Sequence, residues 1–416
     1  MSIAQIVELD IEVDFESTHQ YKWIIGSLNL DDFEKIKEQV WSDKAEEMVL
    51  QVVWSIKGGK MKICVLTGKR GGYGAMRPML RLMRDDPDIR LHILACDMHT
   101  NKEFGRTISE IEEDFECIFP IISSDIRLYG LGGIATLVAR HLTAHKTDLL
   151  MLYGDRGESL AAAMVATEMC IPIAHLQGGD NSGTMDNRRR YALTQLADIN
   201  FVSNEQAEEC VKDTTYPGQA SIHVVGDSHL DPIFEKDYDD KLKIMQDLDL
   251  HDGPIIIVLH HPDPTDKFSG YEYIHRIMDA IDDVGRQIVM IYPCSDPGWE
   301  GVVEAINWFK GHENIQIHKN LPSRTFLGLM NIADCIVGNS SCGIIEAPYL
   351  DLPCVNVGHR QDGRLRGDNV IQASHKVSNI GSAFAWAMEA RPPFEKLYGN
   401  GATGKRIINH LKEWAN

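Results

Sequence analysis

Short apolar runs alternate with amphipathic segments along the chain from Met61 onward. Such continuous runs are typical of parallel strands that are buried on both faces of a sheet. The intervening segments 131–145 and 157–170 place apolar residues on one face of a helix. The first series therefore predicts the strands KICVLT (62–67), LHILAC (91–96), DLLMLY (148–153), IPIAHL (171–176), INFV (199–202) and IHVV (222–225).

The same alternation starts again near residue 255. Two successive series predict an α/β protein with two doubly wound, Rossmann-like domains and a cleft between them. We expect these domains to cover 61–230 and 231–395, with the changeover in the charged stretch 231–253. The strands expected in the second series are IIIVLH (255–260), QIVMIY (287–292), NIQIH (314–318), DCIVG (334–338) and PCVNV (353–357).

Residues 1–60 do not fit this scheme. Apolar residues alternate with polar ones between Ile3 and Phe15, an amphipathic helix is expected near 31–41, and three of the seven tryptophans lie here. This segment is interpreted as a small α+β appendage of unknown role, for which packing or oligomerisation is the favoured interpretation.

Composition narrows the possible partners. The net charge of −20 argues against nucleic acid or an anionic membrane, so any basic site must be local. No apolar run is long enough to span a bilayer, and the acidic N-terminus lacks the features of a secretory signal. The nine cysteines form no C-x-x-C pair, and no zinc-ligand spacing is found. We expect a cytoplasmic protein with reduced, mostly buried thiols and no metal site.

Two polar loops follow strands of the first series, where ligands of open α/β sheets bind. TGKRGGYG (67–74) carries Lys69 and Arg70 in a glycine-rich stretch that suits an anion, although a tight glycine turn is the simpler interpretation. YGDRGES (153–159) carries Asp155 and Arg156, which alternatively form a helix cap and a surface ion pair.

A third loop, GNSSCGIIEA (338–347), precedes an expected helix whose N–H groups and dipole favour an anion such as a diphosphate. Simple N-capping by a serine is the alternative. The residues expected to hold the anion are Asn339, Ser340, Ser341 and Gly343.

Three charged residues complete this group in the second domain. Glu346 is suited to accept hydrogen bonds from ribose hydroxyls, or else is a solvated helix residue. In GHRQDGR (358–364), Arg360 and Arg364 neutralise the same diphosphate or lie on the surface. Together these features indicate a nucleotide diphosphate.

The loop HLQGGDNSGTMD (175–186) follows the expected strand 171–176 and is rich in polar side chains. Three arginines, 188–190, follow it at once. Carboxylates and an imidazole on one domain, facing a diphosphate held by the other, suit a nucleotide-sugar enzyme. Asp186 alternatively caps a helix that begins at Arg188. The loop's polar side chains are His175, Gln177, Asp180, Ser182 and Asp186.

Taken in order, YGDRGE, HLQGGDNSGTMDNRRRYALTQLAD, LHHPDPTD, GNSSCGIIEAP and VGHRQDGR resemble the hydrolysing UDP-N-acetylglucosamine 2-epimerases of sialic and legionaminic acid pathways, over roughly 61–416. The resemblance implies the glycosyltransferase-B fold, a UDP-sugar substrate and no metal or cofactor. It also implies that a C-terminal helix within 396–416 crosses back to the first domain. We expect a homodimer or a homotetramer.

The family's reaction expels UDP by breaking the C1–O bond while a base removes the C2 proton, and water then adds to the resulting glucal to give N-acetylmannosamine. The resemblance places Glu346 on the ribose, and Asp155 and Asp186 among the catalytic acids, with Arg190 orienting them. Gln177, Asp180, His175 and His261 are counted with the catalytic group. Arg156, which lies beside that group, and Arg190 are also counted among the residues that bind the UDP-sugar. Around the diphosphate it places Arg70, His261, Ser340, Ser341 and Arg360, and we group Asn339, Gly343 and Arg364 with them.

Two positions depart from the family pattern. A catalytic glutamate is usual where this chain has Gln177, and an acidic residue is frequent at Gly72. An amide cannot exchange protons, so either Asp155, Asp180 and Asp186 carry the proton transfers or the substrate differs, for example a UDP-2,4-diacetamido-2,4,6-trideoxy-hexose. The alternatives are a non-hydrolysing 2-epimerase, a glycosyltransferase of the same fold, and a catalytically silent UDP-sugar binding module.

Overall fold

The structure, a computed structural model, divides into two compact units, Met1–Met61 and Lys62–Asn416. In the first unit, strands β1 (Ile11–Glu12) and β2 (Ile24–Ile25) pair antiparallel. The rest of the strand expected near 3–15 and the helix expected near 31–41 lie outside the described residues. The structure describes residues 11–12, 24–25, 60–116, 118–120, 130–281 and 285–415.

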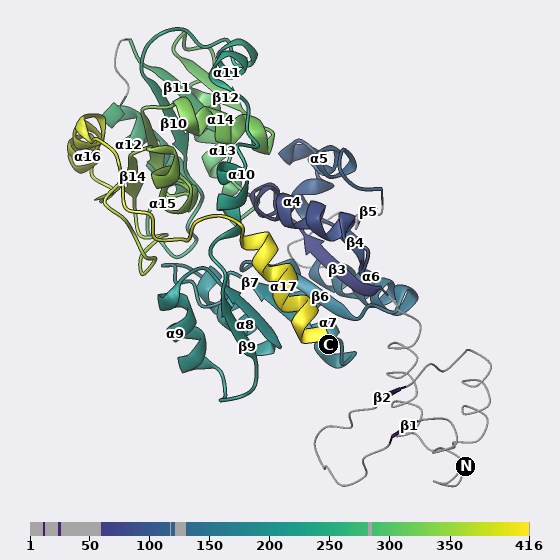
Figure 1. Cartoon of the computed structure of the whole chain (residues 1–416). Coiled ribbons are helices and arrows are strands. Elements are labelled where there is room, and N and C mark those ends of the chain that lie inside the picture. Colours follow the sequence, from purple (N-terminus) through teal and green to yellow (C-terminus); the bar gives the residue numbers. More distant parts are fainter. Residues whose placement is uncertain are drawn as a thin grey trace. The chain divides into compact units, whose positions relative to one another are not determined.

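Seven strands form the sheet of the first Rossmann-like domain, in the order β5-β4-β3-β6-β7-β8-β9 (Figure 1). The pairs β4–β5, β3–β6, β6–β7, β7–β8 and β8–β9 are parallel. The order reverses between β3 and β6, which makes this the topological switch point where ligands of such sheets bind. The strands are β3 (Met61–Thr67), β4 (Ile89–Ala95), β5 (Ile118–Pro120), β6 (Leu149–Tyr153), β7 (Ile173–Leu176), β8 (Ile199–Val202) and β9 (Ser221–Val224).

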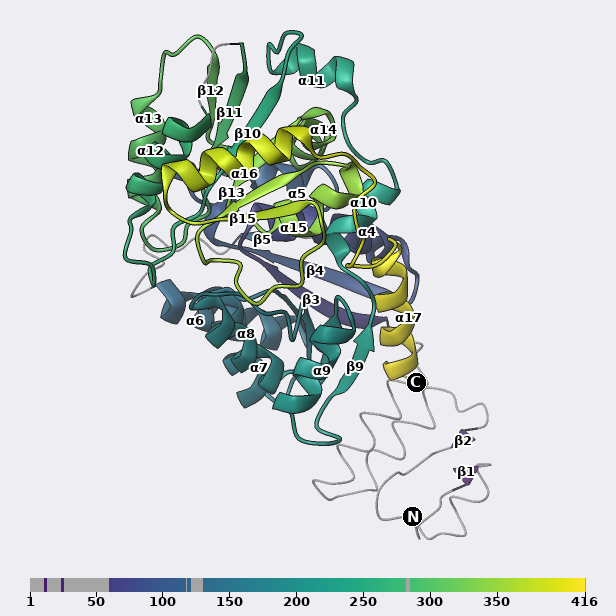
Figure 2. The ribbon, with the colours of Figure 1, turned by 90° about the vertical axis from the view of Figure 1, so that its left-hand side faces the viewer.

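Helices cover both faces of this sheet. Figure 2 shows α6, α7 and α8 on one side of β3 and β4, with α4 and α17 on the other. Ile134, Val138 and Leu142 of α6 are buried against Cys64 and Leu66 of β3, which explains the helical spacing of apolar residues. The helices are α4 (Arg70–Asp85), α5 (Ile108–Glu112), α6 (Leu131–His145), α7 (Gly157–Glu168), α8 (Asp186–Leu196) and α9 (Glu205–Thr214).

The second domain has a six-stranded, all-parallel sheet in the order β12-β11-β10-β13-β14-β15. Its switch point lies between β10 and β13. The strands are β10 (Ile255–Leu259), β11 (Gln287–Ile291), β12 (Ile315–His318), β13 (Cys335–Gly338), β14 (Cys354–Val357) and β15 (Val370–Ala373).

Strand β10 shows why these runs are apolar throughout. Ile256 and Val258 are buried under α12, α13 and α16, whereas Ile257 and Leu259 are buried on the opposite face with α11, α14 and α15. Figure 2 shows α16 lying across the strands. The helices are α10 (Asp231–Phe234), α11 (Lys241–Asp247), α12 (Gly270–Ile281), α13 (Trp299–Trp308), α14 (Ser323–Ile332), α15 (Cys342–Ile345), α16 (Val377–Glu389) and α17 (Thr403–Ala415).

The last helix, α17, packs against α4 of the first domain. Its start is held by Asp231, whose carboxylate accepts the backbone N–H groups of Thr403 at 2.8 Å and Gly404 at 2.7 Å. A side chain at Gly404 would collide with Met79 of α4, because an added Cβ would lie 2.8 Å from it. No helix within the described ranges is long and apolar enough to cross a bilayer.

Both series of expected strands form as predicted, within one or two residues at their ends. Two edge strands, β5 and β15, are absent from the prediction. The first has only three residues and ends in Pro120, and the second is partly exposed, so neither shows the continuous apolar run of a central strand. The expected glycine loop 67–74 is mostly helical, because α4 begins at Arg70.

Candidate active site

Two adjoining cavities open between the Rossmann-like domains, beside the two switch points. Lys69, His229 and Ser341 line both of them, so the cavities meet there. The first cavity contains the predicted residues Arg70, His261, Ser340, Ser341 and Glu346. The second contains Asp155, Arg156, Gln177, Asp186, Arg190, Arg360 and Arg364.

His261 follows β10 and supplies a neutral hydrogen-bond donor to the first cavity. Burial, together with the nearby Arg360 and Lys69, lowers its pKa well below the ordinary value. Its Nδ1 accepts the backbone N–H of Cys294 at 3.1 Å. In the neutral ring the proton therefore sits on Nε2, which is left to donate to a ligand.

The serines after β13 stand in front of a shorter helix than expected. α15 has only four residues, and Pro348 lies in the short 3-10 turn that continues it, Ala347–Leu350. The helix dipole is correspondingly small. Ser340 and Ser341 therefore offer their hydroxyls and local N–H groups, rather than a long helix, to an anion.

Glu346 and His229 form the polar end of the first cavity. Burial raises the pKa of Glu346, whose Oε2 is buried and has no hydrogen-bond partner among the described residues. His229 Nδ1 lies 2.7 Å from Oδ1 of Asp227. Although burial lowers the pKa of His229, Glu346 and Asp227 outweigh it and raise the pKa above its ordinary value. An unpartnered carboxylate oxygen is suited to accept ligand hydroxyls.

Asp155 and Asp186 share the second cavity but have opposite electrostatics. Burial raises the pKa of Asp155, yet Arg190, which is ion-paired to it, outweighs burial and holds the pKa below the ordinary value. Burial and the neighbouring Asp155 raise the pKa of Asp186 despite Arg360. One carboxylate is therefore permanently ionised, and the other is placed to exchange a proton.

Asp186 is the first residue of α8 rather than its cap. Its carboxylate lies 3.4 Å from the Arg189 guanidinium and 3.5 Å from that of Arg360, which reaches it from the second domain. The residue at the cap position, Met185, makes no side-chain capping bond. These contacts disfavour the simple capping interpretation of Asp186.

Gln177 has a specific partner. Its Nε2 donates to Oδ2 of the buried Asp227 at 2.7 Å, and its backbone adopts a left-handed φ of 62°. A glutamate at this position would place a second carboxylate against Asp227, and one of the two would have to be protonated. The amide of Gln177 thus donates to Asp227 where a carboxylate would be repelled by it.

Two of the predicted anion-binding arginines tie the domains together. Arg70 donates to the carbonyl oxygens of Lys319 and Tyr292, both at 2.8 Å. Arg156 pairs with Asp97 of the first domain and, at 2.6 Å, with Asp296 of the second. Protein carbonyl and carboxylate oxygens already accept most of the N–H groups of these two guanidiniums. The two arginines are therefore positioning groups.

Four predicted site residues line neither cavity. His175 is fully buried, hydrogen-bonds the carbonyl of Gly154 at 2.7 Å, and burial lowers its pKa to about 4. Asp180 pairs with Arg364 at 2.8 Å behind the wall. Asn339 accepts the N–H of His261, and Gly343 packs on Cys354 where an added Cβ would lie 2.4 Å from the sulfur. These residues pack against the residues that form the cavity walls.

Lys69, noted above with Arg70 as suited to an anion, lines both cavities and has no ion-pair partner in the part of the chain that the structure describes, which leaves it as a cation for a ligand. Two further wall residues, His229 and Tyr153, were not predicted from the sequence. His229, with Asp227 behind it, follows the expected strand 222–225, a signal that was present in the sequence. Tyr153 ends β6, and its hydroxyl lies 3.1 Å from His229 Nδ1.

Gly72, the second departure from the family pattern, lies in the first turn of α4 against the ring of Tyr153. An added Cβ would lie 3.0 Å from that ring. A larger residue here would move Tyr153 and with it the contact to His229.

Two doubly wound domains that face each other across a polar cleft define a protein of the glycosyltransferase-B fold. The structure superimposes on that of UDP-GlcNAc 2-epimerase from Neisseria meningitidis bound to UDP-GlcNAc with a TM-score of 0.72 and 17% identity, covering 85% of this chain and 100% of that one. A Methanocaldococcus jannaschii UDP-GlcNAc 2-epimerase in complex with UDP-GlcNAc and UDP gives a TM-score of 0.71 at 19% identity, covering 85% and 100%.

The sequence matches the family described as UDP-N-acetylglucosamine 2-epimerase over residues 81–412, and the chain belongs to this family. It is 31% identical to the UDP-N,N'-diacetylbacillosamine 2-epimerase (hydrolyzing) of Legionella pneumophila over 84% of this chain and 95% of that protein. It is 29% identical to a UDP-N-acetylglucosamine 2-epimerase of Neisseria meningitidis, over 85% and 96%.

Proposed function

We propose that this protein is a hydrolysing 2-epimerase that converts UDP-N-acetylglucosamine to N-acetylmannosamine and UDP. The observation that carries the proposal is the meeting of two chemically different cavities at Lys69 and Ser341. One cavity offers neutral donors and an apolar wall, and the other offers carboxylates and guanidiniums. A UDP-sugar has the matching halves, with the diphosphate between them.

The first cavity takes the UDP. Glu346 accepts the ribose hydroxyls, while the apolar side chains of Ile291, Leu321 and Phe326 line the space for the base. Lys69, His261 Nε2–H and the two serine hydroxyls bind the diphosphate, and Arg360 contacts it from the second cavity. Their donors stabilise the negative charge that grows on the leaving group as the C1–O bond breaks.

The second cavity carries out the proton transfers. Asp186, whose pKa is raised, removes the C2 proton as the C1–O electron pair leaves with UDP. The ionised Asp155 stabilises positive charge at C1, since Arg190 keeps it deprotonated. Water then adds across the C1–C2 double bond, with its hydroxyl going to C1 and a proton to C2, and Gln177 and His229 position it by hydrogen bonds.

The hydrolysing outcome is supported by the relatives. Proteins named as hydrolysing 2-epimerases are 31% and 27% identical to this chain. Two Methanococcus maripaludis relatives, named UDP-N-acetylglucosamine 2-epimerase and a homolog of it, are 21% and 24% identical. The loop 175–186 is tied to the second domain by the buried ion pair of Asp180 with Arg364.

A second candidate substrate is a UDP-2,4-diacetamido-2,4,6-trideoxy-hexose. The Legionella relative bears the name of an enzyme for such a sugar. The contact of Gln177 with Asp227 favours this candidate too, because the sugar-facing wall carries a glutamine at a position where a glutamate is usual. The elimination and hydration steps are the same for both sugars.

Product analysis tests the proposal. The full chain is incubated with each UDP-sugar, and the products are separated by anion-exchange chromatography and identified by mass spectrometry. Release of UDP with a free 2-epimerised sugar supports it, and the higher kcat/KM identifies the substrate. Formation of UDP-N-acetylmannosamine, transfer to an acceptor, or no turnover of either sugar contradicts it.

A further inference from the structure

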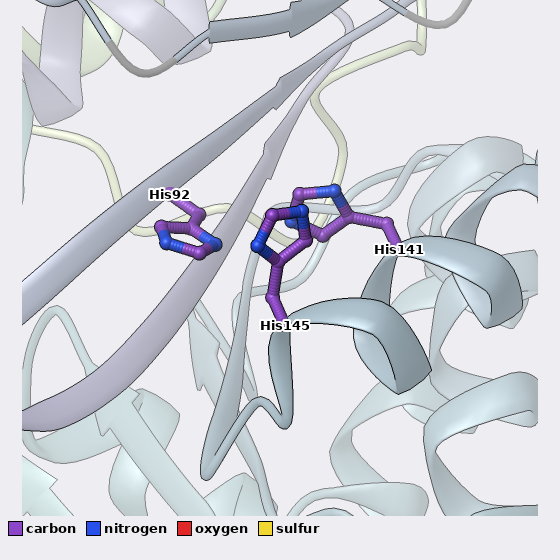
Figure 3. A group of neighbouring side chains, drawn as sticks. All are labelled: His92, His141 and His145. Atoms are coloured by element: carbon purple, nitrogen blue, oxygen red, sulfur yellow. The ribbon is translucent and has the colours of Figure 1, made fainter.

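Three histidines converge within the first domain, away from both cavities. His92 lies on β4, and His141 and His145 lie one turn apart at the end of α6 (Figure 3). Their ligand nitrogens are within 4.8 Å of one another. Over the ranges that the structure describes, no other group of three His, Cys, Asp or Glu side chains comes this close.

The rings are packed together and shielded. His141 and His145 have ring centroids 4.2 Å apart, and His92 lies 4.5 Å from His145. His92 and His141 are buried, and His145 is half-buried. Phe119 covers the group, with its ring centroid 4.4 Å from that of His141. Figure 3 shows the three imidazoles facing one another between strand and helix.

His141 Nε2 is buried and has no hydrogen-bond partner among the residues described. Buried polar atoms in folded proteins are nearly always bonded, and one without a partner costs free energy. The hydrophobic packing of Phe119 does not satisfy this nitrogen. A ligand with a vacant orbital would satisfy it by accepting the lone pair of this nitrogen.

Two of the three side chains, His92 and His141, are in the protonation state that metals require. Burial, with His145, Arg90 and Lys62, lowers the pKa of His92 to about 4. Burial and the two other histidines lower that of His141 to about 4 as well. At neutral pH both rings are therefore uncharged, and neutral imidazole is the form that coordinates a metal.

We propose that His92, His141 and His145 bind a divalent transition-metal ion of the Zn²⁺ class. An all-imidazole set favours Zn²⁺, Cu²⁺ or Ni²⁺ over Mg²⁺ or Ca²⁺. Tetrahedral Zn²⁺ with Zn–N bonds of about 2.0–2.1 Å needs nitrogens about 3.3 Å apart, so the rings close by at most about 1.5 Å through side-chain rotation. The half-buried His145 gives the ion a way in.

The proposed ion would lie at the edge of the sheet opposite to the cavities, where its role would be structural. α6 runs antiparallel to the strands and ends just before β6 begins, so His141 and His145 lie at the amino edge of the sheet, whereas both cavities lie at the carboxyl edges. The metal would link β4 to α6 and stabilise this side of the domain. In the sequence, HLTAH (141–145) supplies only two ligands, and the third lies on a distant strand, which is why no metal site is predicted from spacing.

Metal titration of the full chain tests this site. The protein is freed of metal with a chelator and titrated with Zn²⁺ by calorimetry, and separately with Co²⁺ while the visible absorption is recorded. We expect one ion per chain, a four-coordinate Co²⁺ spectrum, and a Tm that rises with Zn²⁺ concentration. His145→Ala should weaken Zn²⁺ binding more than tenfold and abolish the Co²⁺ spectrum.

Controls keep the result unambiguous. His145 is partly exposed, so its alanine variant should match the wild-type Tm in chelator. His410→Ala removes a ring from another histidine pair, stacked on His223 at 4.0 Å, and should bind Zn²⁺ as wild type does. The site is overturned if the metal-free wild type binds no Zn²⁺, or if His145→Ala and His92→Ala both bind it with unchanged affinity.

Discussion

Both cavities lie beside the switch point of a Rossmann-like sheet, but the charged groups that line them differ. In the first, the residue beside the switch point is a neutral His261. Its cations are Arg70, which donates to backbone carbonyls, and Lys69, which has no ion-pair partner among the described residues. In the second, Asp155 and Asp186 lie among Arg190, Arg360 and Arg364. Neutral, fixed donors suit binding, whereas paired charges with divergent pKa values suit proton transfer.

Two aspartates of one loop differ in whether they line the second cavity. Asp180 and Asp186 lie six positions apart in one loop, yet only Asp186 lines the cavity. Gly179, just before Asp180, adopts a left-handed φ of 73° at a tight turn, and only glycine fits there because an added Cβ would lie 2.1 Å from the Ala207 carbonyl oxygen. This turn directs Asp180 to Arg364 and leaves Asp186 at the start of α8. The comparison between the cavities can be tested at each of these positions.

The largest expected effect is on stability and comes from the wall behind the second cavity. Asp180→Asn leaves the buried guanidinium of Arg364 without its carboxylate, which should cost about 3–5 kcal/mol of unfolding free energy. Urea unfolding measures it. Asp362→Asn, which removes the carboxylate from its exposed pairs with His359 and Arg366, is the control and should stay within about 0.5 kcal/mol. A stable Asp180→Asn with lost turnover would instead make Asp180 catalytic.

Asp186→Asn should affect turnover and spare stability. Without a carboxylate no group removes the C2 proton, so kcat should fall roughly a hundredfold or more. In wild type, kcat should fall as the pH drops through the raised pKa of Asp186, because the protonated acid is not a base. The variant's residual rate should lack this acid limb. Wild-type rates in a folded Asp186→Asn protein would remove Asp186 from the chemistry.

Arg360→Ala should weaken UDP binding, because Arg360 is the buried guanidinium that links the second cavity to Asn339 of the diphosphate loop. Losing a charge-assisted hydrogen bond should cost about 1.5–3 kcal/mol, measured by calorimetry with UDP. Arg366→Ala, in the same loop but outside both cavities, should bind UDP normally. Equal affinities for the two variants would place Arg360 outside the diphosphate site.

Gln177→Glu should give the smallest change, a severalfold loss of kcat at neutral pH. The new carboxylate meets Asp227 at the 2.7 Å contact and one of them must hold a proton. The double variant Gln177→Glu/Asp227→Asn restores an amide–carboxylate pair and should recover part of the rate. A single variant with faster turnover of UDP-N-acetylglucosamine would mark the glutamine as adapted to a different natural substrate.

The sequence predicted the architecture well because central strands such as β10 are buried on both faces and read as uninterrupted apolar runs. It predicted the loops at the switch points for the same reason, since each follows such a strand. It could not tell which charges are already paired. Arg70 and Arg156 resemble anion ligands in sequence, but their partners, Tyr292 and Asp296, lie in the other domain.

The most direct test of the account is NMR of UDP-N-acetylglucosamine turnover by the full chain in D₂O. Elimination and hydration at the second cavity predict that UDP and free N-acetylmannosamine appear at equal rates, with deuterium at C2 in every product molecule. Product that keeps its C2 proton, or that stays attached to UDP, would contradict the division of work between the two cavities.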